Sequence, residues 1–293
     1  GQIIESTGWT KYLALLARPL FQFGRLGHQC SAAFTAAFFS GVTANAMLVD
    51  FFKEDKISRS QLFLTNLTNQ FPAFFLHLPT TFFIVIPLTG LAGGLYFLVT
   101  FIAVLLRTIL VLLYGYIRLP ALPKVTASGD KAYEPGKSRK IAARKVWMNI
   151  KQKLPKRITA IGVYVVPIYI AVFLLNSLGF FDLTRQWLAQ LVVTAFIPIE
   201  ALSLIVLSFA AEFTSGFAAA GALLEAGVLT TKQTVLALLI GNIVAFPLRA
   251  LRHQLPRYMG IFAPKMGLQL LLLGQGYRVI SLIIVGGLYY VLF

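Results

Sequence analysis

Residues 38–52 read FFSGVTANAMLVDFF, and residues 213–227 read FTSGFAAAGALLEAG. The two stretches lie 175 residues apart, and each carries a serine-glycine step, then small residues, then a carboxylate. Identical residues pair at Phe38/Phe213, Ser40/Ser215, Gly41/Gly216, Ala44/Ala219 and Leu48/Leu223, with Asp50 opposite Glu225. This repeat predicts a chain built from two related halves.

The composition indicates a membrane protein. Of the 293 residues, 58% are hydrophobic and 12% are charged, whereas a soluble domain has about 25% charged residues. A spanning helix needs roughly 20 mostly apolar residues. Stretches 91–117, 158–179, 186–210 and 267–293 meet this requirement, and 30–52, 60–78 and 232–248 are apolar but interrupted. We therefore expect an all-α integral membrane protein.

The positive charge, +16 in total, is concentrated in one segment. Residues 119–157 hold 11 Lys or Arg residues against Asp130 and Glu134. The positive-inside rule places such a loop in the cytoplasm. In a membrane protein a basic loop favours contact with anionic lipid over nucleic acid, so we expect the lipid bilayer and no nucleic acid as partner. The predicted location is the cell (inner) membrane, with several passes.

The sequence carries no enzyme motif that we recognise. Cys30 is the single cysteine, and HExxH, P-loop and GxGxxG patterns are absent. We therefore predict a protein that is not an enzyme and has no metal site and no cofactor.

The two halves share more than the first motif. Phe71-Pro72 matches Phe246-Pro247 at the same offset, and each half ends in a long apolar helix with one arginine, Arg107 or Arg278. Repeats with broken helices, joined by a basic loop, are typical of transporters. The expected units are an interfacial N-terminal helix (1–29), a first repeat (30–117), a basic cytoplasmic loop (118–157), a linking transmembrane helix (158–182) and a second repeat (183–293).

The candidate substrate-binding residues lie where the helices are predicted to break. Proline and Ser-Gly steps leave backbone groups that lipid cannot satisfy, so such steps line cavities or pack on protein. Tight packing through small residues is an equally open interpretation. The candidates at these steps are Ser40, Gly41, Asn45, Ser215 and Gly216.

Four further polar residues complete the candidate site. Asn66, Asn69 and Asn242 lie in apolar segments, where an amide forms interhelical hydrogen bonds or contacts a ligand. Glu212 lies in LSFAAEFTSGF without a nearby cation, and an ionisable residue at such a position is a candidate for function. For Arg107 and Arg278, snorkelling or a carboxylate partner is favoured over direct binding.

The Ser-Gly helices, the N-x2-N-x-F-P motif of 66–72 and the run LLIGNIVAFPLRALRHQLPRYMGIF resemble the nucleoside-recognition, or Gate-domain, membrane proteins. That family is similar to concentrative nucleoside transporters, the ferrous iron transporter B membrane region and spore maturation proteins A and B. The resemblance implies two Gate-like helical repeats with broken or re-entrant helices, arranged in opposite orientations. It also implies that two elements, Ser40–Asn45 with Asn66–Pro72 and Ser215–Ala220 with Gly241–Pro247, meet near the membrane centre.

The helix count leaves the orientation open: one crossing by residues 73–117 makes the repeats parallel, and two crossings make them inverted. The favoured function is a transporter or permease for a small molecule or ion, nucleoside-like, cationic or anionic. The alternatives are a receptor or scaffold that docks a soluble partner through its basic loop, and an intramembrane enzyme using Glu212 with His77 or His253. A homodimer also stays open.

Overall fold

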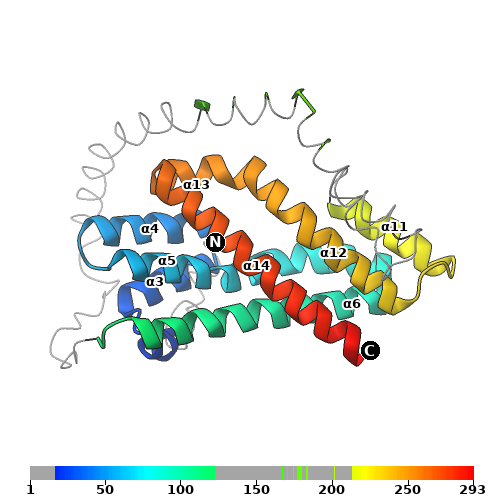
Figure 1. The fold of residues 1–293 in the computed structure, drawn as a ribbon, viewed down its shortest axis with the longest axis horizontal. Helices are drawn as coiled ribbons and strands as arrows, with labels where there is room; N and C mark the ends of the chain where they lie inside the picture. The colour runs from blue at the N-terminus through cyan, green and yellow to red at the C-terminus, as the bar shows by residue number, and fades with distance from the viewer. Residues whose placement is uncertain are drawn as a thin grey trace, which may run out of the picture.

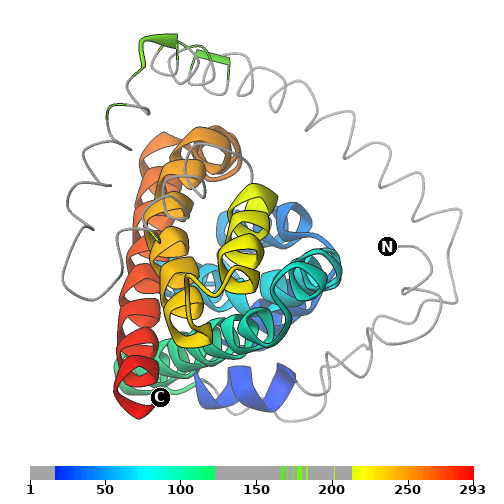
Figure 2. The ribbon, with the colours of Figure 1, turned by 90° about the vertical axis from the view of Figure 1, so that its right-hand side faces the viewer.

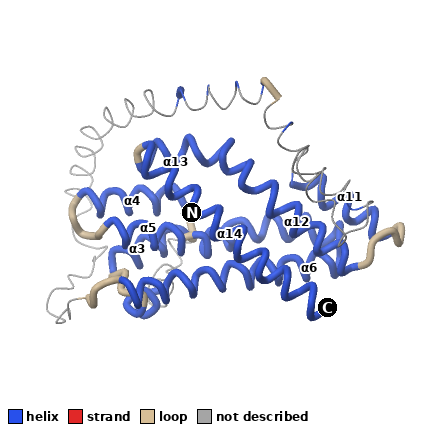
Figure 3. The backbone as a smooth tube through the Cα atoms, viewed as in Figure 1, coloured by secondary structure: helices blue, strands red, loops and turns tan. Residues whose placement is uncertain are grey.

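The computed structural model describes residues 17–122 and 213–293, together with the isolated positions 166, 167, 170, 174, 177–179, 183 and 201. Every regular element in these parts is a helix (Figures 1 and 3). The first described half contains α3 (His28–Ala37), α4 (Gly41–Lys53), α5 (Arg59–Thr68) and α6 (Gln70–Arg118). The second contains α11 (Phe213–Glu225), α12 (Thr231–Arg249), η2 (Ala250–Gln254), α13 (Leu255–Phe262) and α14 (Pro264–Leu292).

Helix α6 consists of two arms that meet at Gly90. This residue has φ 52° and ψ −125°, a backbone conformation that glycine tolerates and other residues rarely adopt. Ring pairs Phe71–Phe101 and Phe82–Phe97, with centroids 6.4 and 5.7 Å apart, show that the arms run antiparallel. Residues 59–118 therefore form one helical hairpin, here called the first hairpin.

Residues 231–292 form a second hairpin of the same kind. Its outgoing arm is α12, η2 and α13, its return arm is α14, and the chain reverses at Ala263 (φ 68°). The outgoing arm contains the π-helical turn η2, which begins three residues after Pro247. Proline has no backbone N–H to donate to a regular helix. Contacts of Arg278 with Phe246 and of Lys232 with Tyr290 join the two arms.

The turns that precede the two hairpins have the same geometry. Helices α4 and α11 both end in a Schellman motif, with Asp55 (φ 54°) or Gly227 (φ 68°) in the left-handed conformation. A capping box then starts α5 and α12, formed by Ser58 with Gln61 and by Thr230 with Gln233. Asp55 and Gly227 are 172 residues apart, as are the two cap residues.

The register of these turns differs from the register predicted from the sequence. Pairing Ser40 with Ser215 requires an offset of 175, which is three residues, or nearly one helical turn, too long for the turns. The Ser-Gly step also interrupts a helix only in the first half, between α3 and α4, whereas α11 runs through Ser215 and Gly216. A shift of about one turn keeps small residues on one helix face, which explains why identity alone favoured the wrong pairing.

The two hairpins run in opposite directions. Arg59 Nη2 donates to Gln269 Oε1 (2.7 Å) and Gln70 Nε2 donates to the Gly274 carbonyl (3.1 Å), so α14 runs alongside α5 in the same sense. Because α12 is antiparallel to α14, it is also antiparallel to α5. Figure 1 shows the α4–α5 turn and the α11–α12 turn at opposite ends of the molecule.

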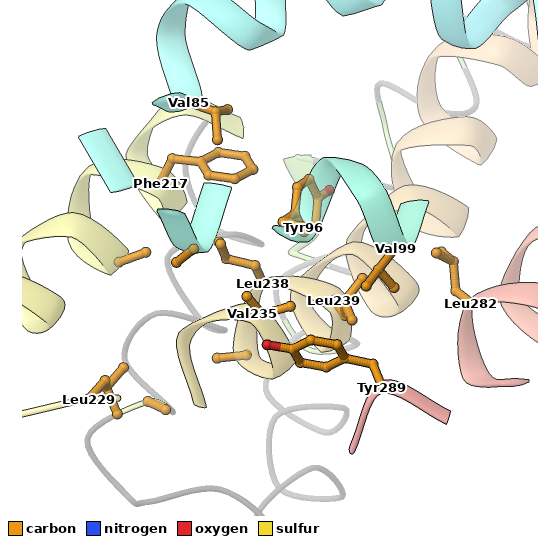
Figure 4. Packing of buried hydrophobic residues seen from close by; sticks show 14 of the residues in the cluster. Val85, Tyr96, Val99, Phe217, Leu229, Val235, Leu238, Leu239, Leu282 and Tyr289 are labelled. Carbon is orange, nitrogen blue, oxygen red and sulfur yellow. The ribbon is translucent and has the colours of Figure 1, made fainter. Parts of the chain in front are cut away.

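The hydrophobic core between the hairpins draws on both halves. Val85, Tyr96 and Val99 of α6 pack with residues of α11, α12 and α14, as Figure 4 shows. Phe217 of α11 contacts Tyr96 with ring centroids 5.3 Å apart. The end view of Figure 2 shows α11 between α12 and α6. A second core cluster joins the segment around Phe21 and Leu26 to α3, α5 and the end of α6.

The length and surface of the helices are those of a membrane protein. Helical stretches Arg59–Arg118, Thr231–Phe262 and Pro264–Leu292 are long and apolar enough to cross a membrane. The first of them comprises two arms, 59–89 and 91–118, each longer than the roughly 20 residues needed. Phe83, Leu91 and Ile117 are largely exposed on α6, as expected of side chains that face lipid rather than water.

Candidate functional site

Two groups of buried polar side chains lie where the hairpins meet. In the first, Asn66 Nδ2 of α5 donates to Asn45 Oδ1 of α4 at 2.9 Å. The phenol of Tyr258, from α13 of the other half, lies beside both amides. Both asparagines are buried. Two of the predicted site residues, Asn45 and Asn66, therefore lie together, with a tyrosine that the sequence analysis did not single out.

Asn69 lies one turn beyond Asn66 and is also buried. Neither its Oδ1 nor its Nδ2 has a hydrogen-bond partner, and the same is true of the Thr65 hydroxyl. A buried amide without partners costs about 1–3 kcal/mol for each group that stays unsatisfied. Asn69 therefore has unused hydrogen-bonding capacity beside the Asn45–Asn66 pair.

The second group also joins an asparagine of one half to a tyrosine of the other half. Asn242 of α12 donates from Nδ2 to the hydroxyl of Tyr96, which belongs to the first hairpin. The Oδ1 of the same amide accepts a hydrogen bond from Arg278 Nη2 at 3.2 Å. Each half thus supplies an asparagine that meets a tyrosine of the other half.

Arginines accompany this second group. The guanidinium of Arg278 lies over the Phe246 ring, 3.4 Å from its centroid, and that of Arg249 lies 4.6 Å from the same centroid. Arg107 Nη1 donates to Ser281 Oγ at 3.3 Å, and Ser281 donates in turn to the Arg278 carbonyl. The Nε atoms of Arg107 and Arg278 are buried without a partner.

Arg278 lies at the middle of α14, far from either end of that helix. Residues 264–277 precede it in α14 and residues 279–292 follow it, which places it about 21 Å from either helix end. A charged side chain at the bilayer centre costs about 2.5–3.5 kcal/mol on insertion scales. The predicted snorkelling is therefore wrong for Arg278, because the side chain turns inward to Asn242.

The predicted carboxylate partner is also not found within residues 17–122 and 213–293. The acidic residues there are Asp50, Glu54, Asp55 and Glu225, all near the ends of α4 and α11. Neither Arg107 nor Arg278 forms an ion pair with any of them.

The remaining predicted site residues lie elsewhere. Ser40 caps α4 by accepting from the Thr43 N–H (3.2 Å), and Gly41 is exposed at the start of that helix. Gly216 is buried in α11. Glu212 and the side chain of Ser215 lie outside the described residues. The role of Ser40 is therefore that of a helix cap, which its residue type favours.

Within the two elements that were predicted to meet, the small-residue helices α4 and α11 do not pack mainly on each other. Instead, α4 packs mainly on α3, α5 and α13, and α11 packs mainly on α6 and α12. The reason is the opposite direction of the hairpins, since each small-residue helix then covers the reversal of the other half. A Cβ atom at Gly221 of α11, for example, would collide with the Leu88 carbonyl next to the Gly90 reversal.

The described parts therefore define an all-helical membrane protein with a polar centre between two hairpins. The chain is similar to two Methanocaldococcus jannaschii proteins named Uncharacterized protein MJ0871 and Uncharacterized protein MJ1556. The first is 25% identical over 294 residues, covering 97% of this chain and 87% of the relative. The second is 26% identical over 281 residues, covering 95% and 86%. No family model matches the chain, and no solved structure matches it.

Proposed function

We propose that the chain is a multi-pass permease of the cell membrane that binds a small solute between two inverted helical repeats. The observation that carries this proposal is the exchange of polar contacts between the halves. Asn66 of the first half lies beside Tyr258 of the second, and Asn242 of the second half donates to Tyr96 of the first. Polar side chains buried at the interface of two repeats are typical of transporter binding sites.

The geometry of the turns supports the repeat. Two Schellman turns with capping boxes, each followed by a hairpin that reverses at Gly90 or Ala263, recur in the same order. Because the hairpins run in opposite directions, a membrane normal along the long axis of Figure 1 makes the repeats inverted. In this proposal the hairpins correspond to the two Gate-like elements that the sequence resemblance implies.

The charges of the two ends support an orientation. One end carries the α4–α5 turn, the end of α6 and the Ala263 reversal, and it gathers Lys53, Lys56, Arg59, Arg118, Arg257 and Lys265. Among the described residues of the opposite end, at the α11–α12 turn, the basic residue is Lys232. By the positive-inside rule the basic end faces the cytoplasm.

Transport would follow from rocking of one hairpin against the other. In such a motion the contacts Asn66–Tyr258 and Asn242–Tyr96 separate and re-form as the polar centre opens to alternate sides. Substituting Asn66 or Asn242 by Leu keeps the side-chain volume similar but removes these contacts. We therefore expect both variants to lose transport.

Transport is tested with the purified protein in liposomes. Uptake of labelled nucleosides, divalent metal ions and small anions is compared with that of protein-free liposomes. Tyr289→Phe serves as the control, because this tyrosine lies in the same core but its hydroxyl forms no hydrogen bond within the described residues. Uptake of none of these solutes, by protein shown to be folded, would contradict the permease function and favour the receptor or scaffold alternative.

A further inference from the structure

Arg107 and Arg278 form the centre of a site that the polar contacts alone do not explain. They lie on the return arms of the two hairpins and are connected through Ser281. Arg107 is only 8% exposed and Arg278 is partly buried. Ser281, which accepts from Arg107, lies three residues, or about one helical turn, after Arg278. Two like charges held largely away from water favour an anion between them, and no carboxylate of residues 17–122 and 213–293 pairs with either arginine.

The hydrogen bonds leave part of each guanidinium group unused. Arg107 Nη1 is bound to Ser281, and Arg278 Nη2 is bound to Asn242, whereas both Nε–H donors are buried and unpartnered. The neutral groups Asn242 and Ser281 fix the side chains but do not compensate their charge. A planar guanidinium fork with free donors can bind two oxygens of a carboxylate, phosphate or sulfate group at once.

We propose that the solute bound between the hairpins is an oxyanion, held by Arg107 and Arg278 and positioned by Asn242. That the bound oxyanion is a transported solute rests on the proposed function. Binding of the oxyanion can be tested without transport. A neutral nucleoside would add no charge to balance two arginines that no described carboxylate balances, and a divalent metal ion would be repelled by them.

The binding test uses the whole protein purified in a nonionic detergent without anionic lipid. Inorganic phosphate, sulfate and acetate are each titrated against chloride at constant ionic strength, with uridine as the neutral probe. The thermal midpoint and the calorimetric Kd are recorded. We expect saturable binding of at least one oxyanion, no binding of uridine, and a Kd at least tenfold weaker in Arg278→Gln and Arg107→Gln.

Arg118→Gln is the matched control, because it removes the same charge from the exposed end of α6. Its Kd should equal that of the wild type. If either Gln variant does not fold, the Lys variant at the same position retains the charge but loses the fork, and its Kd should still be weaker than that of the wild type. Absence of saturable oxyanion binding to the wild type, or equal weakening by Arg118→Gln, overturns the proposal.

A lipid phosphate offers the same chemistry, so a second arm separates the two sources. Phosphatidylglycerol is added to the lipid-free protein, with phosphatidylcholine as control. If phosphatidylglycerol stabilises the protein through Arg107 and Arg278 while none of the three free anions binds, the site holds a lipid and the solute assignment is overturned. Competition of free oxyanion with phosphatidylglycerol for the wild type, lost in Arg278→Gln, supports it.

Transport is measured separately in phosphatidylcholine liposomes, so that the two proposals can fail independently. Oxyanion binding without uptake contradicts the permease function and leaves the oxyanion site in place. If uridine is taken up and neither Arg107→Gln nor Arg278→Gln affects its uptake, the permease function is supported and the proposal that the solute is an oxyanion is overturned.

Discussion

The contact between Asn242 and Tyr96 joins the two halves, and a double-mutant cycle measures its strength. Tyr96→Phe removes only the hydroxyl that accepts from Asn242 Nδ2. Asn242→Leu keeps the side-chain volume similar but leaves the Tyr96 hydroxyl and Arg278 Nη2 without their hydrogen-bond partner. The two changes together remove both ends of the contact, so the cycle isolates the interaction between the side chains.

The structure sets the size of these effects. Hydrogen bonds between helices in a membrane contribute about 0.6 kcal/mol on average, with a maximum near 1.7, and a bond to a charged group contributes about 1.5–3 kcal/mol in proteins generally. We therefore expect Tyr96→Phe to lower the free energy of unfolding by about 0.6–1.5 kcal/mol. Asn242→Leu should lower it by about 2–4 kcal/mol, because a charged donor also loses its acceptor.

The assay is reversible unfolding of the purified protein in mixed micelles, followed by circular dichroism. The interaction energy of the cycle should be about 0.5–1.5 kcal/mol. Tyr289→Phe should change the free energy of unfolding by less than about 0.5 kcal/mol, as expected away from buried hydrogen bonds. An interaction energy indistinguishable from zero would refute the view that this pair holds the halves together.

Three further predictions concern local structure. Ser58→Ala and Thr230→Ala each remove the side chain of a capping box and should each cost about 1 kcal/mol in chemical denaturation; clearly unequal losses would argue against equivalent turns. Gly267→Ala places a Cβ 2.7 Å from backbone atoms of α13 and should destabilise the protein by about 1–3 kcal/mol. Gly287→Ala on the same helix meets open space and should leave the stability unchanged. A thermal-shift assay compares the two variants. Burial raises the pKa of the Cys30 thiol from 9.0 to about 11. Maleimide should therefore label Cys30 at pH 8 only upon unfolding, and rapid labelling of the folded protein would contradict its burial. The free energy of unfolding should fall between pH 9 and 11, because the thiol ionises at lower pH in the unfolded chain than in the folded one.

The sequence predicted the helices better than it predicted their contacts. Composition identified a helical membrane protein, and the apolar stretches 91–117 and 267–293 correspond to the return arms of the hairpins. Asn45 was selected beside the Ser-Gly step and Asn66 as a polar residue within an apolar segment, and the two side chains do meet. Local composition is sufficient for such predictions because it records how much apolar surface a helix must bury or expose to lipid.

The surroundings of the arginines could not be predicted in this way. Arg107 meets Ser281, which is 174 residues away, and Arg278 meets Asn242 on the opposite arm of its hairpin. These contacts depend on where the chain reverses, and on hairpins that run in opposite directions. A position at the middle of a spanning helix, too far from either end for snorkelling, is the sequence signal that would have indicated an inward-facing Arg278.

The last prediction tests whether the two repeats are inverted. Lys56 and Val228 occupy the same position in the two Schellman turns, since each donates its N–H to the carbonyl five residues earlier. Both are exposed, and the turns lie at opposite ends of the molecule (Figure 1). In an inverted arrangement these two equivalent positions must face opposite sides of the membrane, whereas parallel repeats would place them on the same side.

Single cysteines at the two positions, in a Cys30→Ala background, allow the sides to be assigned. A membrane-impermeant maleimide added to intact cells should label Val228→Cys, because the end with few basic residues faces outward by the positive-inside rule. Lys56→Cys should be labelled only after the membrane is permeabilised, and loss of the Lys56–Glu54 pair at this exposed turn should cost little stability. Labelling of both cysteines from outside, or of neither, would mean that the turns share one side, and the inverted repeat would then be wrong. Labelling of Lys56→Cys alone would keep the inversion and reverse the orientation, so that the basic end would face outward.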